Sequence, residues 1–403
     1  MQKFFVLAAS IIIQLALGSV YTWSTFAPYL TDGFGLTQAQ AQLIFGTTIA
    51  IFSVSMIPAG RLLKRYGPRL IALIGGCLFG IGYLLASWSG GSFALLLVGI
   101  GIIAGTGLGF GYVCPITTCI RWFPTRKGLI SGIAVAGFGS GAVLLSLLAA
   151  NMFSTGKTVL EIFQWIGLWY GGTIAVASLF LTNPRGCETT VADTHGTSGN
   201  ILLDRRFLAL AVGMWAGTFG GLLVIGNLKP IGLAASVPVG YAAAAISGFA
   251  VGNGLGRLFW GALSDRLGAR AIPSSLLFLA GAILLLLIRF PVSWMFVVTA
   301  FLTGFGFGAC FVVYMTQTAN EFGANRIAQV YPFVFLFYGF SGIAGPTIGG
   351  WLYDKTGTYT TAILIGAGVS ILGAIGHMLL SSAQKIGKQE DQSGTLQTAR
   401  QPR

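Results

Sequence analysis

The chain has 403 residues, of which 55% are hydrophobic and only 8% are charged, and its formal net charge is +13. Soluble domains carry charge on roughly a quarter of their residues, so this composition excludes a soluble globular protein. The 60 glycines point the same way, because close contacts between helices in lipid depend on small residues.

Twelve apolar runs are each long enough to cross a membrane, for which a helix needs roughly 20 apolar residues. Six precede the polar stretch in the middle of the chain, at 4–30, 43–63, 70–88, 93–120, 128–152 and 162–181. Six follow it, at 207–228, 239–263, 272–290, 294–319, 330–352 and 360–380. We therefore predict an all-α polytopic membrane protein with twelve transmembrane helices.

The longest break in hydrophobicity divides these helices into two groups of six. We predict an N-terminal half (1–182), a cytoplasmic linker (183–206), a C-terminal half (207–381) and a disordered polar tail in the cytoplasm (382–403). Tandem six-helix halves are a known transporter design, in which the binding site lies near the midplane between the halves.

The basic residues predict the orientation, because cytoplasmic loops carry the excess of Lys and Arg. With the N-terminus in the cytoplasm, most of the 23 Lys and Arg residues fall on the cytoplasmic side. The exceptions are Lys157, Lys229, Arg289 and Lys355, expected outside, and Arg257, expected within a span. Topology thus explains the positive charge without nucleic-acid binding. We expect a lipid-embedded, monomeric, multi-pass protein of the bacterial inner (plasma) membrane, with both termini cytoplasmic.

Two cytoplasmic loops, after the second and the eighth helix, repeat one pattern. Its members are Gly60, Arg65, Gly67 and Arg69 in the first loop, and Gly261, Asp265, Arg266, Gly268 and Arg270 in the second. Both loops resemble the signature of the major facilitator superfamily, Gly-x-x-x-Asp-Arg-x-Gly-x-Arg/Lys, and 342–350 (GIAGPTIGG) resembles its Gly-Pro-Gly-Gly helix motif. The resemblance implies a gating latch at the cytoplasmic helix ends. Lys64 stands at the Asp position of the first loop, so only the second copy is complete.

Three further stretches resemble the monocarboxylate porters and oxalate/formate exchangers within that superfamily. They are 18–24 (GSVYTWS) in helix 1, 121–129 (RWFPTRKGL) between helices 4 and 5, and 253–257 (NGLGR) in helix 8. The last of these stretches carries the substrate arginine of those proteins. The resemblance therefore implies that Arg257 binds the substrate.

Arg257 is also the only strong ionisable group predicted deep within a span, and none of the ten carboxylates falls near the middle of one. An arginine at the bilayer centre costs roughly 2.5 to 3.5 kcal/mol on insertion scales. A substrate carboxylate in a water-filled cavity would satisfy the guanidinium by a two-point contact. The alternative is that Arg257 snorkels to the cytoplasmic helix end near Gly261.

The other candidate substrate-binding residues are polar or aromatic side chains on several helices. Asn253 lies one turn before Arg257 on the same face, although a hydrogen bond across helices explains it as well. Tyr331, Phe335 and Tyr338 form one stripe on helix 11, which is explained by packing as readily as by a site. The remaining candidates for cavity walls are Tyr21 on helix 1, Tyr112 on helix 4 and Tyr314 on helix 10.

Two of these positions depart from the proteins that the chain resembles. Many monocarboxylate porters have an acid at the place of Asn253, where it takes part in proton coupling. Oxalate/formate exchangers have a lysine at the place aligned with Tyr338, which is the second cation for a dicarboxylate. One fixed positive charge matches one carboxylate, so we expect a monocarboxylate such as lactate, pyruvate or formate.

We predict a secondary active transporter of small monocarboxylates that works by alternating access and is coupled to protons. The resemblance favours proton symport, whereas the sequence itself favours exchange, because no Asp, Glu or His lies at a membrane centre. His195 and His377 are expected to be solvated. A carboxylate exchanger of the oxalate/formate type and a non-transporting membrane sensor remain as alternatives.

The sequence argues against an enzyme. It has no paired carboxylates, no His-Glu-x-x-His motif and no Ser/His/Asp set within the predicted spans. The five cysteines show no metal-ligand spacing. We therefore expect no metal and no cofactor, and the expected partner is a small organic carboxylate anion, with a proton in the case of symport.

Overall fold

The computed structural model describes residues 2–123, 127–184, 203–288, 292–322 and 327–398. These residues form helices and no strand. The elements of the N-terminal half are α1 (Gln2–Gly18), η1 (Ser19–Thr22), α2 (Trp23–Phe34), α3 (Gln38–Ser87), α4 (Phe93–Leu96), η2 (Leu97–Ala104), α5 (Gly105–Trp122), α6 (Lys127–Ser154), α7 (Val159–Trp165), η4 (Ile166–Tyr170) and α8 (Gly171–Ser178). Those of the C-terminal half are α9 (Arg205–Ala234), α10 (Val239–Leu267), η6 (Gly268–Arg270), α11 (Ala271–Leu284), η7 (Leu285–Leu287), α12 (Trp294–Phe322), α13 (Ile327–Thr356) and α14 (Thr360–Thr398).

The described residues contain eleven stretches that are long and apolar enough to cross a membrane. One of them, Val239–Leu287, is 49 residues long and holds both α10 and α11, joined by the short η6. Counted as two crossings, it brings the described spans to the twelve that the sequence predicts. The predicted all-α membrane fold is confirmed.

Glycine makes the turns of the two repeated loops possible. Gly67 interrupts α3 with φ 80° and ψ 168°, and Gly268 ends α10 with φ 53° and ψ −130°. Residues with a side chain rarely adopt positive φ, so the recurrence of glycine has a backbone cause. The side chain of Gln317 on α12 donates a 2.8 Å hydrogen bond to the Gly268 carbonyl, which ties the second turn to the bundle.

Helices α10 and α12 pack closely through glycines on both. Gly252 and Gly256 lie against the backbone of α12, where a β-carbon would clash with carbonyl oxygens. Gly304 and Gly308 lie against α10 in the same way. Small residues spaced by four allow helix backbones to approach closely in lipid. This contact fixes the position of α10 and therefore of Arg257.

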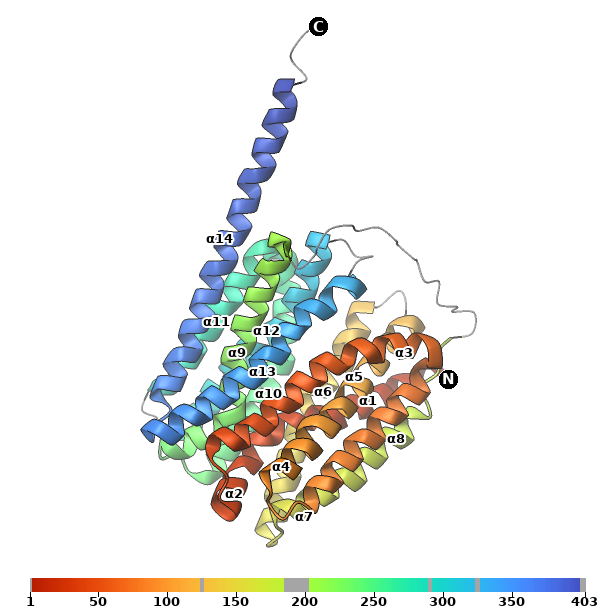
Figure 1. Cartoon of the computed structure of the whole chain (residues 1–403), viewed down its shortest axis with the longest axis vertical. Coiled ribbons are helices and arrows are strands. Elements are labelled where there is room, and N and C mark those ends of the chain that lie inside the picture. The colour runs from red at the N-terminus through yellow and green to blue at the C-terminus, as the bar shows by residue number, and fades with distance from the viewer. Residues whose placement is uncertain (1, 124–126, 185–202, 289–291, 323–326, 399–403) are drawn as a thin grey trace.

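The two halves meet along α3 and α13, α6 and α10, and α2 and α9, and Figure 1 shows α3 and α13 side by side. We call the end of the bundle where α3 begins and α13 ends the outer end, following the predicted orientation. There the Asp354 carboxylate accepts hydrogen bonds from the backbone N–H groups of Gln38 (3.1 Å) and Ala39 (2.9 Å). The positive end of the helix dipole favours a carboxylate at this place. These contacts hold the halves together at the outer end.

Helix α14 extends beyond the bundle (Figure 1). It is helical to Thr398, whereas we expected a disordered tail over 382–403. Its polar residues include Gln, Lys and Glu, which have favourable helix propensities, so low hydrophobicity alone did not predict its conformation. Most of the expected linker, 183–206, lies outside the described residues.

Gly252→Val is expected to lower the thermal stability of the purified protein, because a side chain there overlaps the backbone of α12. Overpacking of this kind costs about 1–3 kcal/mol. The unfolding midpoint in detergent measures the effect. Gly281→Val on α11 is the matched control, because a β-carbon at Gly281 meets no atom within 4 Å. Equal midpoints for the two variants would contradict the described packing.

Candidate functional site

Arg257 lies in the interior of α10, where its side chain is 5% exposed. Its Nε donates a 3.2 Å hydrogen bond to Oδ1 of Asn253, one turn earlier on the same helix. Asn253 is fully buried. A β-carbon at Gly308 would lie 3.0 Å from the backbone nitrogen of Arg257, so the glycine packing of α12 determines where this pair sits. Arg257 is therefore buried among protein groups, and the predicted snorkelling alternative does not describe this structure.

Groups from both halves surround the guanidinium. Its Cζ lies 4.4 Å from the ring centroid of Phe311 on α12, within the range of a cation–π contact. The hydroxyl of Tyr112 on α5, in the N-terminal half, lies close enough to interact with the guanidinium. The charge also acts on the hydroxyls of Tyr21, Tyr331 and Tyr338. Arg257 thus sits where the two halves meet.

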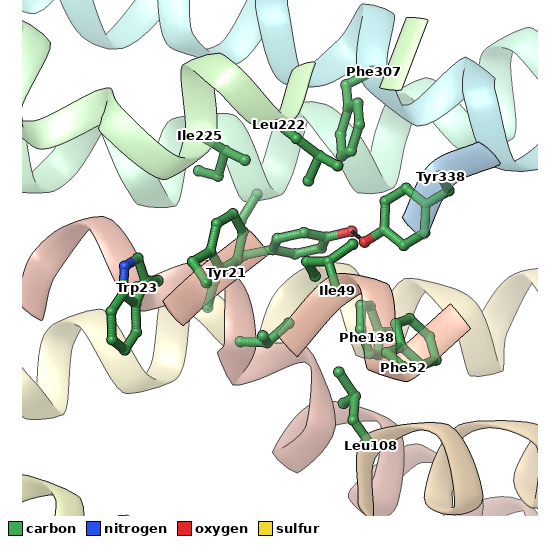
Figure 2. Packing of buried hydrophobic residues seen from close by; sticks show 14 of the residues in the cluster. Tyr21, Trp23, Ile49, Phe52, Leu108, Phe138, Leu222, Ile225, Phe307 and Tyr338 are labelled. Atoms are coloured by element: carbon green, nitrogen blue, oxygen red, sulfur yellow. Dashed lines mark hydrogen bonds between the residues drawn. The ribbon is translucent and has the colours of Figure 1, made fainter. Parts of the chain in front are cut away.

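The hydroxyls of Tyr21 and Tyr338 share a 3.0 Å hydrogen bond between the halves. Figure 2 shows the two hydroxyls pointing at each other, with rings packed around them. Tyr21 lies in η1, a short 3-10 segment between α1 and α2, and such segments within long helices often mark functional hinges. The GSVYTWS stretch singled out in the sequence therefore coincides with a local change of helix type.

The predicted stripe of Tyr331, Phe335 and Tyr338 lies on α13. It belongs to a cluster of aromatic side chains, which we call the central cluster and which also contains Tyr21, Phe52, Tyr112, Phe138, Phe307 and Phe311. Phe335 packs between Tyr331 and Tyr338, with ring centroids 5.9 and 5.0 Å away. The Tyr331 hydroxyl donates a 3.3 Å hydrogen bond to the backbone carbonyl of Phe311. The stripe thus combines packing with hydrogen bonding, and its role in substrate binding stays a prediction.

Some predicted residues lie elsewhere. The Tyr314 hydroxyl is 2.7 Å from where a β-carbon of Gly213 would lie, which places its ring between α12 and α9. The charged members of the predicted gating motif, Arg65, Arg69, Asp265, Arg266 and Arg270, are all exposed. The ion pairs formed by the described residues, Lys157–Glu161 and Arg206–Asp204, do not involve these loops. The latch stays a prediction.

Sequence reasoning missed several aromatic residues of the cluster. Phe52 of α3 and Phe138 of α6 pack against Tyr112, with ring centroids 5.1 Å away in each case. Phe307 and Phe311 of α12 reach the cluster from the other half, and the Phe307 ring is 6.2 Å from that of Tyr21. The sequence spacing could have indicated Phe307 and Phe311. They lie four residues apart, and each follows by three residues a glycine that packs against α10, namely Gly304 or Gly308.

Two charged or titratable residues are placed differently from expectation. Lys229 was expected outside after a span ending at residue 228, but α9 continues to Ala234 and Lys229 is only 4% exposed. Helix α9 runs through Pro230, because proline is tolerated within membrane helices. His377 was expected to be solvated, but it is 4% exposed and its Nδ1 lies 3.1 Å from the Ala209 carbonyl. His195 lies outside the described residues.

The site offers a cation and hydrogen-bond donors. Arg257 can only donate, so the Asn253 atom facing it has to be Oδ1, and Nδ2 points elsewhere. This buried Nδ2 has no hydrogen-bond partner in the part of the chain that the structure describes. A donor of this kind beside a guanidinium suits an oxygen acceptor with negative charge. The described residues hold no group of three or more metal-ligating side chains.

A polytopic helical protein whose two halves enclose a buried cation and hydrogen-bonding side chains has the construction of a membrane transporter. The sequence matches the family model of the Major Facilitator Superfamily over residues 7–230 and 208–400. The chain belongs to the Major Facilitator Superfamily, as the gating loops predict. It is a multi-pass membrane transporter of that family.

Several relatives align over most of the chain. The MFS-type transporter YhjX of Escherichia coli (strain K12) is 28% identical, over 85% of this chain and 86% of its own. The oxalate:formate antiporter of Oxalobacter formigenes is 27% identical, over 92% and 89%. Monocarboxylate transporter 13 of Rattus norvegicus is 25% identical, over 93% and 87%. The predicted resemblance to these two kinds of carboxylate transporter is confirmed.

Tyr21→Phe and Tyr338→Phe are each expected to lower the unfolding midpoint, because each leaves the other buried hydroxyl without this partner. An unsatisfied buried hydroxyl costs about 1–3 kcal/mol. The variant with both substitutions should be at least as stable as the less stable of the two single variants. A double-mutant cycle on thermal unfolding measures the coupling. Strictly additive losses would contradict a hydrogen bond between the two hydroxyls.

Proposed function

We propose that this protein is a secondary active transporter of small monocarboxylates, such as lactate, pyruvate or formate. Arg257 binds the carboxylate at the centre of the membrane, and the aromatic side chains around it pack against the short organic part. The two halves rock about this site, which opens alternately to each side of the membrane. We place the protein in the bacterial inner membrane with both termini in the cytoplasm.

The pair formed by Arg257 and Asn253 carries this proposal. Nε of Arg257 holds Oδ1 of Asn253 at 3.2 Å, and the buried Nδ2 of Asn253 has no hydrogen-bond partner among the residues that the structure describes. One carboxylate can accept from both side chains, since its two oxygens present about four acceptor sites. Charge-assisted bonds of this kind are about twice as strong as neutral ones.

The number of cations at the site favours a monocarboxylate. The described neighbours of Arg257 include the Asn253 amide, the Tyr112 hydroxyl and the Phe311 ring, which are neutral. At the place aligned with the second cation of oxalate/formate exchangers stands Tyr338, which is neutral. The names of the relatives, an oxalate:formate antiporter and a monocarboxylate transporter, support a carboxylate as the substrate class.

We propose proton symport as the coupling, with exchange as the alternative. The bound carboxylate, or a water beside it, carries the proton, because Asn253 stands where many monocarboxylate porters have an acid. Exchange would follow if Arg257 without an anion cannot pass through the closed, dry state. An anion in the site neutralises the charge, so that loaded carriers reorient faster than empty ones.

Arg257→Gln is expected to lower the uptake of labelled lactate, pyruvate, formate or oxalate into proteoliposomes to at least tenfold below wild type. The reason is that a charge-assisted contact contributes roughly 1.5–3 kcal/mol. Arg205→Gln is the matched control, since Arg205 is exposed at the start of α9. Each protein is assayed with an inward proton gradient and, separately, with preloaded substrate. Stimulation by protons indicates symport, and stimulation by preloading indicates exchange.

Two outcomes would contradict the proposed function. If wild type takes up none of these anions, the substrate class is wrong, and binding without uptake would favour the sensor. If Arg257→Gln transports as fast as wild type, the carboxylate is bound elsewhere. Thermal unfolding of each variant in detergent shows whether a loss of uptake reflects a loss of folded protein.

Asn253→Asp is expected to make uptake depend on pH in a new way. An aspartate at this place would lie beside the guanidinium that now bonds to Asn253 at 3.2 Å, and it would compete with the substrate while ionised. The guanidinium lowers the pKa of this aspartate and its burial raises it. Uptake by the variant should therefore be severalfold below wild type at pH 7.5 and rise as the pH falls toward that pKa. Initial rates between pH 5 and 7.5 measure this. Asn253→Leu, which has no ionisable group, should lack the recovery at low pH.

A further inference from the structure

Lys229 is a second buried cation, nearer the outer end than Arg257. It lies on α9 and is 4% exposed, and its ammonium lies 4.8 Å from the ring centroid of Tyr29 on α2. Tyr29 in turn stacks on Phe153 of α6 at 3.7 Å. Because α2 and α6 belong to the N-terminal half and α9 to the C-terminal half, this cation–π contact joins the halves.

Gln42 of α3 lies against the same segment of α9. It is fully buried, and neither its Oε1 nor its Nε2 has a hydrogen-bond partner in the part of the chain that the structure describes. A β-carbon at Gly226 would lie 2.8 Å from Gln42 Oε1, so the amide touches α9 one turn before Lys229. Residues three apart share a helix face. An ammonium and an unsatisfied amide therefore lie at the same part of the interface.

This pair lies on the path between the outer end and the central cluster. Lys229 is seven residues beyond Leu222, a distance of about 10 Å along an α-helix. Gln42 is ten residues before Phe52, or about 15 Å. In Figure 2 Leu222 lies beside the bonded hydroxyls of Tyr21 and Tyr338, and the Phe52 ring centroid is 6.2 Å from that of Tyr338. An anion moving from outside to Arg257 would pass Lys229 and Gln42 first.

We propose that Lys229 and Gln42 form an outer binding site for the transported carboxylate, which the anion occupies before it reaches Arg257. This inference rests on the proposed function. When the halves part at the outer end, α2 moves away from α9, and the Tyr29 ring leaves the ammonium. The exposed ammonium attracts the carboxylate, and the Gln42 amide donates a hydrogen bond to it. When the halves close, the ring again satisfies the cation.

The test is uptake and efflux in proteoliposomes that carry the protein in one orientation. The probe is whichever of lactate, pyruvate, formate and oxalate wild type transports fastest. Lys229→Gln should raise the KM measured from the outer side about three- to fivefold, the effect of a partly exposed ion pair, and leave the KM from the inner side unchanged. Influx and efflux balance when the anion has the same concentration on both sides. With the maximal influx rate and the inner KM unchanged, a higher outer KM therefore requires the maximal efflux rate to fall by the same factor.

Two control variants distinguish the effect of the positive charge at Lys229 from the effect of a lysine elsewhere on the protein. Lys229→Arg keeps the cation and should keep the outer KM within twofold of wild type. Lys355→Gln removes an exposed lysine at the end of α13 and should leave both KM values unchanged. The outer KM of wild type should rise with added salt, because screening weakens the attraction, and that of Lys229→Gln should rise less.

Gln42→Leu separates a ligand-binding role from a structural one. Replacing an unsatisfied buried amide by an apolar group of similar volume is neutral or stabilising, so the unfolding midpoint should stay equal or rise while the outer KM rises. A lower midpoint with an unchanged outer KM would overturn the role of Gln42.

An outer KM that stays unchanged in Lys229→Gln, or an equal rise on both sides, overturns the outer site. If Arg257→Gln in the same vesicles transports at the wild-type rate, the proposed function fails instead, whatever Lys229 does. A wild type that transports none of the four anions overturns both.

Discussion

A guanidinium buried between the two halves of a membrane protein is the constraint on which the rest of the site depends. Arginine keeps its charge at any physiological pH, so polar groups nearby have to replace the water that it has lost. The same helix supplies the Asn253 amide, and α12 supplies the Phe311 ring. The other half supplies the Tyr112 hydroxyl. The charge is therefore stabilised by elements that alternating access would move relative to each other.

The packing around Arg257 gives this arrangement both stiffness and freedom to move. Glycines on α10 and α12 bring the two backbones into contact, so that the helix carrying Arg257 and Asn253 is held firmly within its own half. Between the halves the contacts include hydrogen bonds: the bonded hydroxyls of Tyr21 and Tyr338, and the Asp354 carboxylate at the start of α3. Such contacts can be exchanged for water or substrate at small cost. Rigid halves joined by exchangeable contacts are what a rocking transporter requires.

Hydrophobicity and loop chemistry predicted the helices, the family and the burial of Arg257, because these depend on local sequence. The positive φ at Gly67 and Gly268 explains why glycine recurs in the two repeated loops. The bond between Tyr21 and Tyr338 spans 317 residues, and periodicity within one helix does not say which residue of another helix it meets. Phe52 and Phe138 were missed for that reason. Lys229 was misplaced because the polar residues Asn227 and Lys229, followed by Pro230, imitate the end of a helix.

The central claim is that Arg257 and Asn253 together hold the carboxylate of the substrate. The most direct measurement is an experimental structure with the monocarboxylate that the transport assay selects. We predict its oxygens within about 3 Å of the Arg257 guanidinium and of Asn253 Nδ2, the distance of a charge-assisted hydrogen bond. Ligand density away from both side chains, in a protein that transports the same anion, would contradict the account.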